Sequence, residues 1–117
     1  MAKQAFGPVS SAPYSSGIKT GGLAFVSGQI GQGETVAEQT ASALANLTTV
    51  LAAAGLDLSD VVKTTVFLTD VTTIAEMNEV YCATFPEPLP CRSTIGVNGL
   101  PAPELKVEIE AIAQTRS

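Results

Sequence analysis

The sequence contains no histidine, and this single absence removes several kinds of chemistry. Serine–histidine and cysteine–histidine catalysis, imidazole metal sites and a histidine general base are all excluded. Any acid–base chemistry must therefore use aspartate, glutamate, tyrosine, lysine or an ordered water molecule. Candidate catalytic groups have to be sought among carboxylates and hydroxyls.

Basic residues are also scarce. There are six, against eleven acidic residues, and the formal net charge is −5. Nucleic-acid binding needs clustered lysine and arginine to neutralise phosphates, whereas these six are scattered along the chain. We therefore expect a small-molecule ligand, with no nucleic-acid partner.

Long apolar runs and patterned cysteines are missing as well. No segment approaches the ~20 apolar residues of a membrane span, and residues 1–4 carry no apolar signal segment. We expect a cytoplasmic protein without a membrane partner. Cys82 and Cys91 lack metal-site or redox-motif spacing, so we interpret them as small apolar side chains in a reducing compartment. No metal site is expected.

Charged residues make up only 15% of the 117 residues, whereas hydrophobic residues make up 45%. The length suits one hydrophobic core, so we expect a single domain over residues 1–117. A small protein with so few charges is expected to bury part of its exterior in an oligomer.

Hydrophobic periodicity predicts two helices and four clear strands. Residues 36–54 form one helix, with Gly55 and Leu56 placed for a Schellman ending. A second helix runs from Thr73, where Thr73-x-x-Glu76 fits a capping box, to Phe85. The strands span 23–27, 60–69, 92–97 and 105–113, and short strands are expected among the loops of 7–22. The order β-β-α-β-α-β-β predicts an α+β domain whose helices cover one face of a mixed sheet.

Arg92 is the most informative residue, because the only other arginine is the penultimate Arg116. Its planar fork can bind a carboxylate through two hydrogen bonds, which lysine cannot do. Thr94 shares its strand face, and the following strand carries Glu108 and Glu110 on one face. An arginine that can clamp an anion, on a strand next to one that carries a proton acceptor, indicates an enzyme for a small carboxylic acid. The alternative is an ordinary charged face in contact with solvent.

Three further polar residues are candidates. Asn78 lies within the apolar stripe of the second helix, where its amide either bonds to nearby backbone or supports a site. Tyr14 follows a proline in a loop, and Ser27 ends an apolar strand. Each of these two has a structural alternative: Tyr14 as a packing residue and Ser27 as a turn former.

Taken together, these segments resemble the reactive intermediate deaminase family, also called the Rid or YjgF-like family. The resemblance covers nearly the whole chain, in the order Pro13-Tyr14, Ser27-Gly28-Gln29-Ile30, Ala53-Ala54-Gly55-Leu56, Val62-Lys63-Thr64-Thr65-Val66-Phe67, Met77-Asn78-Glu79-Val80-Tyr81, Pro90-Cys91-Arg92-Ser93 and residues 106–113.

The resemblance implies a chorismate-mutase-like fold in a homotrimer with a central barrel and clefts between subunits. It implies hydrolysis of 2-aminoacrylate, 2-iminopropanoate or 2-iminobutanoate to a 2-oxo acid and ammonia, without a cofactor. Arg92 falls at the family's carboxylate-binding arginine, and Glu108 at the acid that orients or activates water. Tyr14, Ser27 and Asn78 fall at positions that line or support the cleft.

Some positions depart from the family pattern. Thr94 stands where the family often has cysteine, and the loops 31–35 and 85–89 are short, which leaves the substrate preference open. Glu110 matches no catalytic position and is taken as structural. Two other functions stay open: a trimeric sensor that binds small carboxylates without turnover, and a ribonuclease, translation inhibitor or chaperone. The acidic charge and the lack of histidine make RNA cleavage the weakest.

Overall fold

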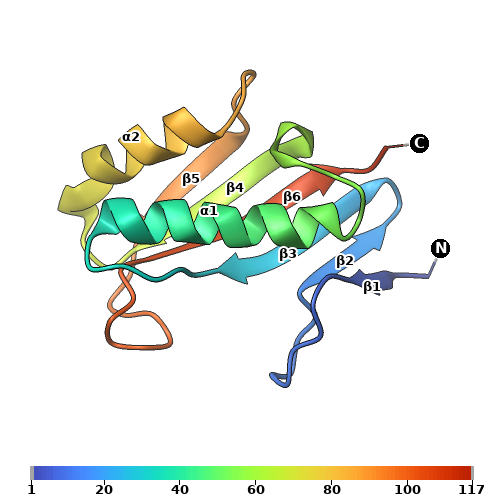
Figure 1. The fold of residues 1–117 in the computed structure, drawn as a ribbon, viewed down its shortest axis with the longest axis horizontal. Coiled ribbons are helices and arrows are strands. Elements are labelled where there is room, and N and C mark those ends of the chain that lie inside the picture. The colour runs from blue at the N-terminus through green and yellow to red at the C-terminus, as the bar shows by residue number, and fades with distance from the viewer. Residues whose placement is uncertain (1, 117) are drawn as a thin grey trace.

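Within residues 2–116, the part of the chain that the computed structural model describes, two α-helices lie on one face of a six-stranded sheet (Figure 1). The elements are β1 (Gln4–Phe6), β2 (Gly17–Thr20), β3 (Leu23–Gln29), α1 (Val36–Ala52), β4 (Val61–Leu68), α2 (Ile74–Thr84), β5 (Cys91–Gly96) and β6 (Val107–Gln114). The strand order is β1-β2-β3-β6-β4-β5, with β4 and β5 parallel and the other neighbours antiparallel. The predicted α+β class is confirmed.

Local sequence signals define both ends of α1. Thr35 caps the N-terminus, and its side chain and that of Glu38 each accept the other's backbone N–H in a capping box. At the C-terminal end Gly55 has a φ of +74°, which favours glycine, and the Leu56 N–H donates to the Leu51 carbonyl at 3.0 Å. The predicted Schellman ending is therefore confirmed.

One strand was not expected from the sequence. β1 pairs antiparallel with β2, so that Gln4 lies opposite Lys19 and Phe6 opposite Gly17. A Cβ atom at Gly17 would overlap the Phe6 ring, so this pairing depends on the glycine. Three residues carry too little alternation to indicate a strand, and β1 exists because β2 offers it a backbone partner.

The capping box predicted for α2 is wrong. Thr73 makes no side-chain cap, because its hydroxyl donates to the Asp70 carbonyl at 2.6 Å in the 3₁₀ turn before the helix. The Glu76 carboxylate instead accepts the Ala37 N–H, in the first turn of α1, at 2.9 Å. Glu76 thus stabilises the N-terminus of the other helix and joins the two helices.

The hydrophobic core fills the space between the helices and the sheet. Val107 and Ile109 of β6 point into it and are fully buried, while Glu108 and Glu110 alternate with them and point away. We call the sheet surface opposite the helices the open face. It carries Leu23, Phe25, Lys63, Thr65, Phe67, Ile95, Glu108, Glu110 and Ile112. No helix of residues 2–116 has both the length and the apolar character needed to cross a membrane.

Candidate active site

Arg92 lies on the helix-covered side of β5, at the edge of the sheet. Its parallel partner in β4 is Thr64, which is fully buried under α2. The guanidinium carbon lies 4.8 Å from the centre of the Tyr81 ring, and Nη1 is 3.9 Å from the Met77 sulfur. Arg92 is half-buried. Both ion pairs found within residues 2–116 belong to Arg116, so Arg92 has no carboxylate partner in the described part of the chain.

The ring beneath Arg92 is itself held in place. The Tyr81 hydroxyl and the Thr64 hydroxyl share a hydrogen bond of 2.6 Å, which connects α2 to β4. Burial raises the pKa of Tyr81, so this hydroxyl stays protonated at neutral pH. Thr94 lies two residues after Arg92 on the same side of β5, opposite Val66. This side of the sheet edge therefore presents a cation and a neighbouring threonine.

Glu108 belongs to the open face, where it lies opposite Phe67 of β4. Burial of its carboxylate raises the pKa of Glu108, and the nearby negative charge of Glu110 raises it further. A carboxylate with a raised pKa is a stronger base once ionised, which suits proton transfer. The side chain lies directly against Gly28, where a Cβ atom would overlap the carboxylate.

A β-bulge in β3 places Ser27 and Gly28 near these acids. Val26 pairs with Ala111 and Gln29 with Ile109, so two residues of β3 lie opposite one residue of β6. The Ser27 hydroxyl donates to the Ser15 carbonyl at 2.6 Å and thereby holds the loop that precedes β2. This loop also carries Tyr14, which is exposed.

A hollow of about 260 Å³ lies on the open face beside the bulge. Ser27, Lys63 and Glu110 line it together with the apolar side chains of Phe25 and Ile112. Lys63 donates to the Thr65 hydroxyl at 3.2 Å. The hollow includes neither Arg92 nor Glu108, so it does not by itself contain the predicted pair.

Asn78 departs from the simpler expectation for a polar residue in an apolar stripe. Its Oδ1 atom is buried and has no hydrogen-bond partner among the described residues 2–116, so the expected bond to nearby backbone is not formed. It follows Met77, whose sulfur contacts Arg92. A buried acceptor without a donor costs about 1–3 kcal/mol, and a donor from outside the chain would remove that cost.

The prediction that the strand of Arg92 lies next to the strand of Glu108 is wrong within one chain. β4 separates β5 from β6, and Arg92 and Thr94 lie on the helix-covered side whereas Glu108 and Glu110 lie on the open face. The sequence showed alternation within each strand, but strand order and the relative orientation of two strands depend on long-range pairing.

Three residues with clear contacts to the candidates were missed from the sequence. Tyr81 and Met77 contact Arg92, and Gly28 makes room for Glu108. Met77 and Tyr81 have the helical spacing of core residues, and nothing in that spacing indicates a cation above them. Gly28 could have been suspected, because a glycine within a strand often marks a bulge or a close approach by another group.

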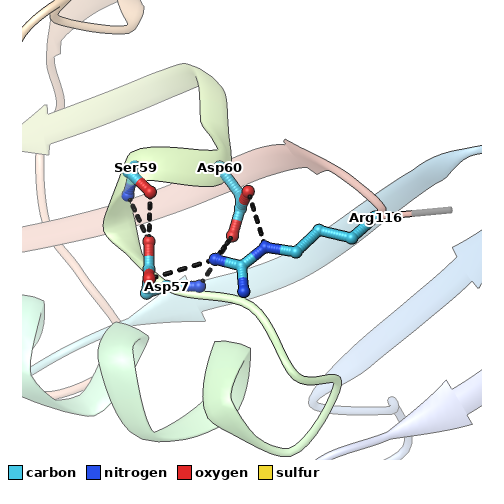
Figure 2. Close-up of polar contacts among 4 residues, drawn as sticks. All are labelled: Asp57, Ser59, Asp60 and Arg116. Carbon is cyan, nitrogen blue, oxygen red and sulfur yellow. Dashed lines mark hydrogen bonds and ion pairs between the residues drawn. The ribbon is translucent and has the colours of Figure 1, made fainter.

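The second arginine has a structural role. Figure 2 shows Arg116 between the carboxylates of Asp57 and Asp60, at 3.0 Å and 2.7 Å. Asp57 also accepts from the backbone and hydroxyl of Ser59, and these bonds, with Arg116, lower the pKa of Asp57. Arg116 thus holds the chain after β6 against the turn before β4. Its charge is paired with two carboxylates, whereas the charge of Arg92 is paired with none among residues 2–116.

Comparisons with known proteins identify the family of this fold. The family described as Endoribonuclease L-PSP matches residues 4–115. Reactive Intermediate Deaminase A, chloroplastic, from Arabidopsis thaliana is 42% identical over 114 residues, which is 91% of this chain and 60% of that relative's length. Protein mmf2, mitochondrial, from Schizosaccharomyces pombe is 41% identical over 109 residues, 86% of each chain. The crystal structure of NMB1025, a YjgF family member from Neisseria meningitidis, superposes with a TM-score of 0.93 at 36% identity, covering 100% of this chain and 98% of that chain. The chain therefore belongs to the YjgF/Rid family, which carries the description Endoribonuclease L-PSP.

Proposed function

We propose that this protein is a deaminase that hydrolyses small enamine and imine acids to 2-oxo acids and ammonia. The observation that carries the proposal is the half-buried guanidinium of Arg92, which has no carboxylate partner within residues 2–116. Such a group is suited to bind the carboxylate of a ligand. Family membership and the relative named Reactive Intermediate Deaminase A support the reaction class. The proposed substrates are 2-aminoacrylate with its tautomer 2-iminopropanoate, and 2-iminobutanoate.

In the proposed reaction Arg92 binds the substrate carboxylate, and Glu108 orients a water molecule and accepts its proton. The water oxygen adds to the carbon of the C=N bond, the nitrogen is protonated, and ammonia leaves as the C=O bond forms. An enamine first takes a proton at its terminal carbon to become the imine. One water is consumed and one ammonia is released, so the reaction needs neither a covalent nucleophile nor a cofactor.

We further propose that the site lies between subunits of a homotrimer. Arg92 and Glu108 lie on opposite sides of one sheet, so two copies are needed to bring both to one small substrate. The open face also leaves Phe25 39% and Ile95 44% exposed, a cost that a subunit interface would remove. Size-exclusion chromatography with light scattering should give three times the chain mass, and a monomeric mass would contradict the assembly.

The remaining candidates have supporting roles in this proposal. Thr94 lies beside the clamp and is proposed to act through its backbone, in which case threonine can replace the cysteine that is frequent in the family. Asn78 offers its unpartnered buried oxygen from the same side of the sheet. Tyr14 and Ser27 come from the copy that supplies Glu108, because the bulge puts Ser27 beside Gly28, which contacts that acid.

A coupled assay tests the reaction. A serine or threonine dehydratase generates the imine in place, semicarbazide competes for it, and release of the 2-oxo acid is followed with the wild type, Arg92→Ala and Glu108→Gln. We expect faster release with the wild type and no acceleration with either variant. Binding of 2-oxobutanoate without any acceleration would instead favour a carboxylate sensor, because a clamp needs no water-activating acid.

The family description mentions an endoribonuclease, and the same protein can be tested on RNA. With a net charge of −5 and no histidine we expect no cleavage and no salt-dependent RNA binding.

The cytoplasmic location also stays a proposal, to be tested by cell fractionation.

A further inference from the structure

Arg92 is supported from below by two uncharged side chains of α2. Its guanidinium carbon lies 4.8 Å from the Tyr81 ring centre, and its Nη1 donates toward the Met77 sulfur at 3.9 Å. The electron-rich face of an aromatic ring attracts a cation without neutralising its charge. A carboxylate in the same place would occupy the N–H groups that a ligand needs. Tyr81 and Met77 hold the cation and leave most of its donors unused.

The ring has little freedom to move. The Tyr81 hydroxyl is fixed by the 2.6 Å hydrogen bond to Thr64 of β4, and the ring packs against Phe85 with 4.6 Å between ring centres. Only 2% of the Tyr81 surface is exposed. Because several contacts hold the ring, losing one of them should leave it in place beneath Arg92, whereas losing the ring itself should not.

We propose that Tyr81, assisted by Met77, is a positioning residue that orients the Arg92 guanidinium for carboxylate binding and so determines the affinity for substrate. This inference rests on the proposed function and extends it. The ring face carries the effect, and the hydroxyl only anchors the ring. Loss of the ring leaves the long arginine side chain free to sample other rotamers, and ordering it then opposes binding.

The environment of the Arg92 side chain can be measured by NMR without overlap from many other arginines, because Arg92 and Arg116 are the only two in the sequence. A ¹⁵N–¹H spectrum of the whole protein therefore contains two arginine Nε–Hε signals, and Arg116→Lys assigns them. We expect the Arg92 signal to lie upfield of the Arg116 signal, because a proton above an aromatic ring is shielded. An Arg92 signal at the position of a free arginine in the wild type would overturn the proposal without any variant.

Three variants separate positioning from packing. Tyr81→Phe keeps the ring and loses the hydroxyl, Tyr81→Leu loses the ring, and Phe85→Leu removes a neighbouring buried ring as a matched packing control. The Arg92 signal should stay upfield in Tyr81→Phe and Phe85→Leu and move to the free position in Tyr81→Leu. Titration with 2-oxobutanoate should give about tenfold weaker binding in Tyr81→Leu alone, as the strength of such cation–ring contacts implies.

Kinetics complete the test. In the coupled assay KM should rise about tenfold in Tyr81→Leu with kcat within about twofold, and both constants should stay near wild type in Tyr81→Phe. Equal effects on KM in Tyr81→Leu and Phe85→Leu would overturn the positioning role. The NMR readout does not depend on activity. If the Arg92 signal and the affinity for 2-oxobutanoate both depend on the Tyr81 ring, but the protein does not turn over imines, only the proposed deaminase function is overturned.

Discussion

The guanidinium of Arg92 and the carboxylate of Glu108 lie on opposite sides of the same sheet. Arg92 shares the side of Thr64 and lies over Tyr81 of α2, whereas Glu108 pairs with Phe67 on the open face. β4 runs between the two strands that carry them. One chain therefore does not bring both groups to one small ligand.

Complementation between two inactive variants should follow from this separation. In trimers assembled from equal amounts of Arg92→Ala and Glu108→Gln, about one site in four joins the intact Arg92 of one copy to the intact Glu108 of another. We expect co-expressed variants to recover about a quarter of wild-type activity in the coupled assay. The two variants folded separately and then mixed serve as the control and should stay inactive. No recovery after co-assembly would place both groups in the same copy.

The pH dependence of activity should report the environment of Glu108. Burial and the charge of Glu110 raise the pKa of Glu108, so activity should rise with pH as this raised pKa is passed and the carboxylate ionises. Glu110→Gln removes the repulsion and lowers the pKa of Glu108, which shifts the acid limb of the kcat/KM profile to lower pH. Glu108→Gln should lower kcat roughly 100-fold or more and abolish the limb. A limb that stays in place in Glu110→Gln would mean that another group titrates.

Gly28 should be needed for activity because of the space it leaves. A methyl group at this position would overlap the Glu108 carboxylate and displace it. We expect Gly28→Ala to lower kcat roughly tenfold to a hundredfold, as small misplacements of catalytic groups do. Gly99→Ala is the matched control, because a Cβ atom there meets nothing within 4 Å. Equal activity of the two variants would remove Glu108 from the reaction or show that its position is not critical.

Arg116 should affect stability and not catalysis. Arg116→Ala leaves the buried Asp60 carboxylate without its partner, so the urea midpoint should fall while the imine assay is unchanged. The pKa of Asp57 is lowered in the folded protein, so its contribution to stability is present at neutral pH and is lost as pH falls through that lowered pKa. Most of this lowering comes from the bonds to Ser59, which Arg116→Ala leaves in place, so only the part due to Arg116 should be lost from the difference between wild type and variant as the pH falls below roughly 4.

Lys3→Ala, which changes an exposed basic residue outside this cluster, is the control for the change in net charge. An equal fall of the urea midpoint in both variants would mean that overall charge, and not the bonds to the aspartates, is responsible.

The helices, the strand alternation and the candidate residues could be read from the sequence because they depend on neighbours in the chain. Thr35 with Glu38 and Gly55 with Leu56 define the ends of α1 through bonds within a few residues. The presence of a single internal arginine pointed to Arg92 as the anion-binding residue, and the absence of histidine pointed to a carboxylate as the proton acceptor. Neither step needed any knowledge of the fold.

Only the tertiary structure decided where these elements meet. A strand alternates with period two by itself, but which strand lies beside it, and which of its faces is covered, is set by backbone pairing between distant segments. That pairing inserts β6 between β3 and β4, adds β1 to the edge and turns Arg92 toward Tyr81 and Glu108 away from it. Glu76 likewise became a cap for α1 only when α2 packed beside it. The residues of the candidate site were thus visible in the sequence, whereas their division between two sides of the sheet arises from long-range contacts.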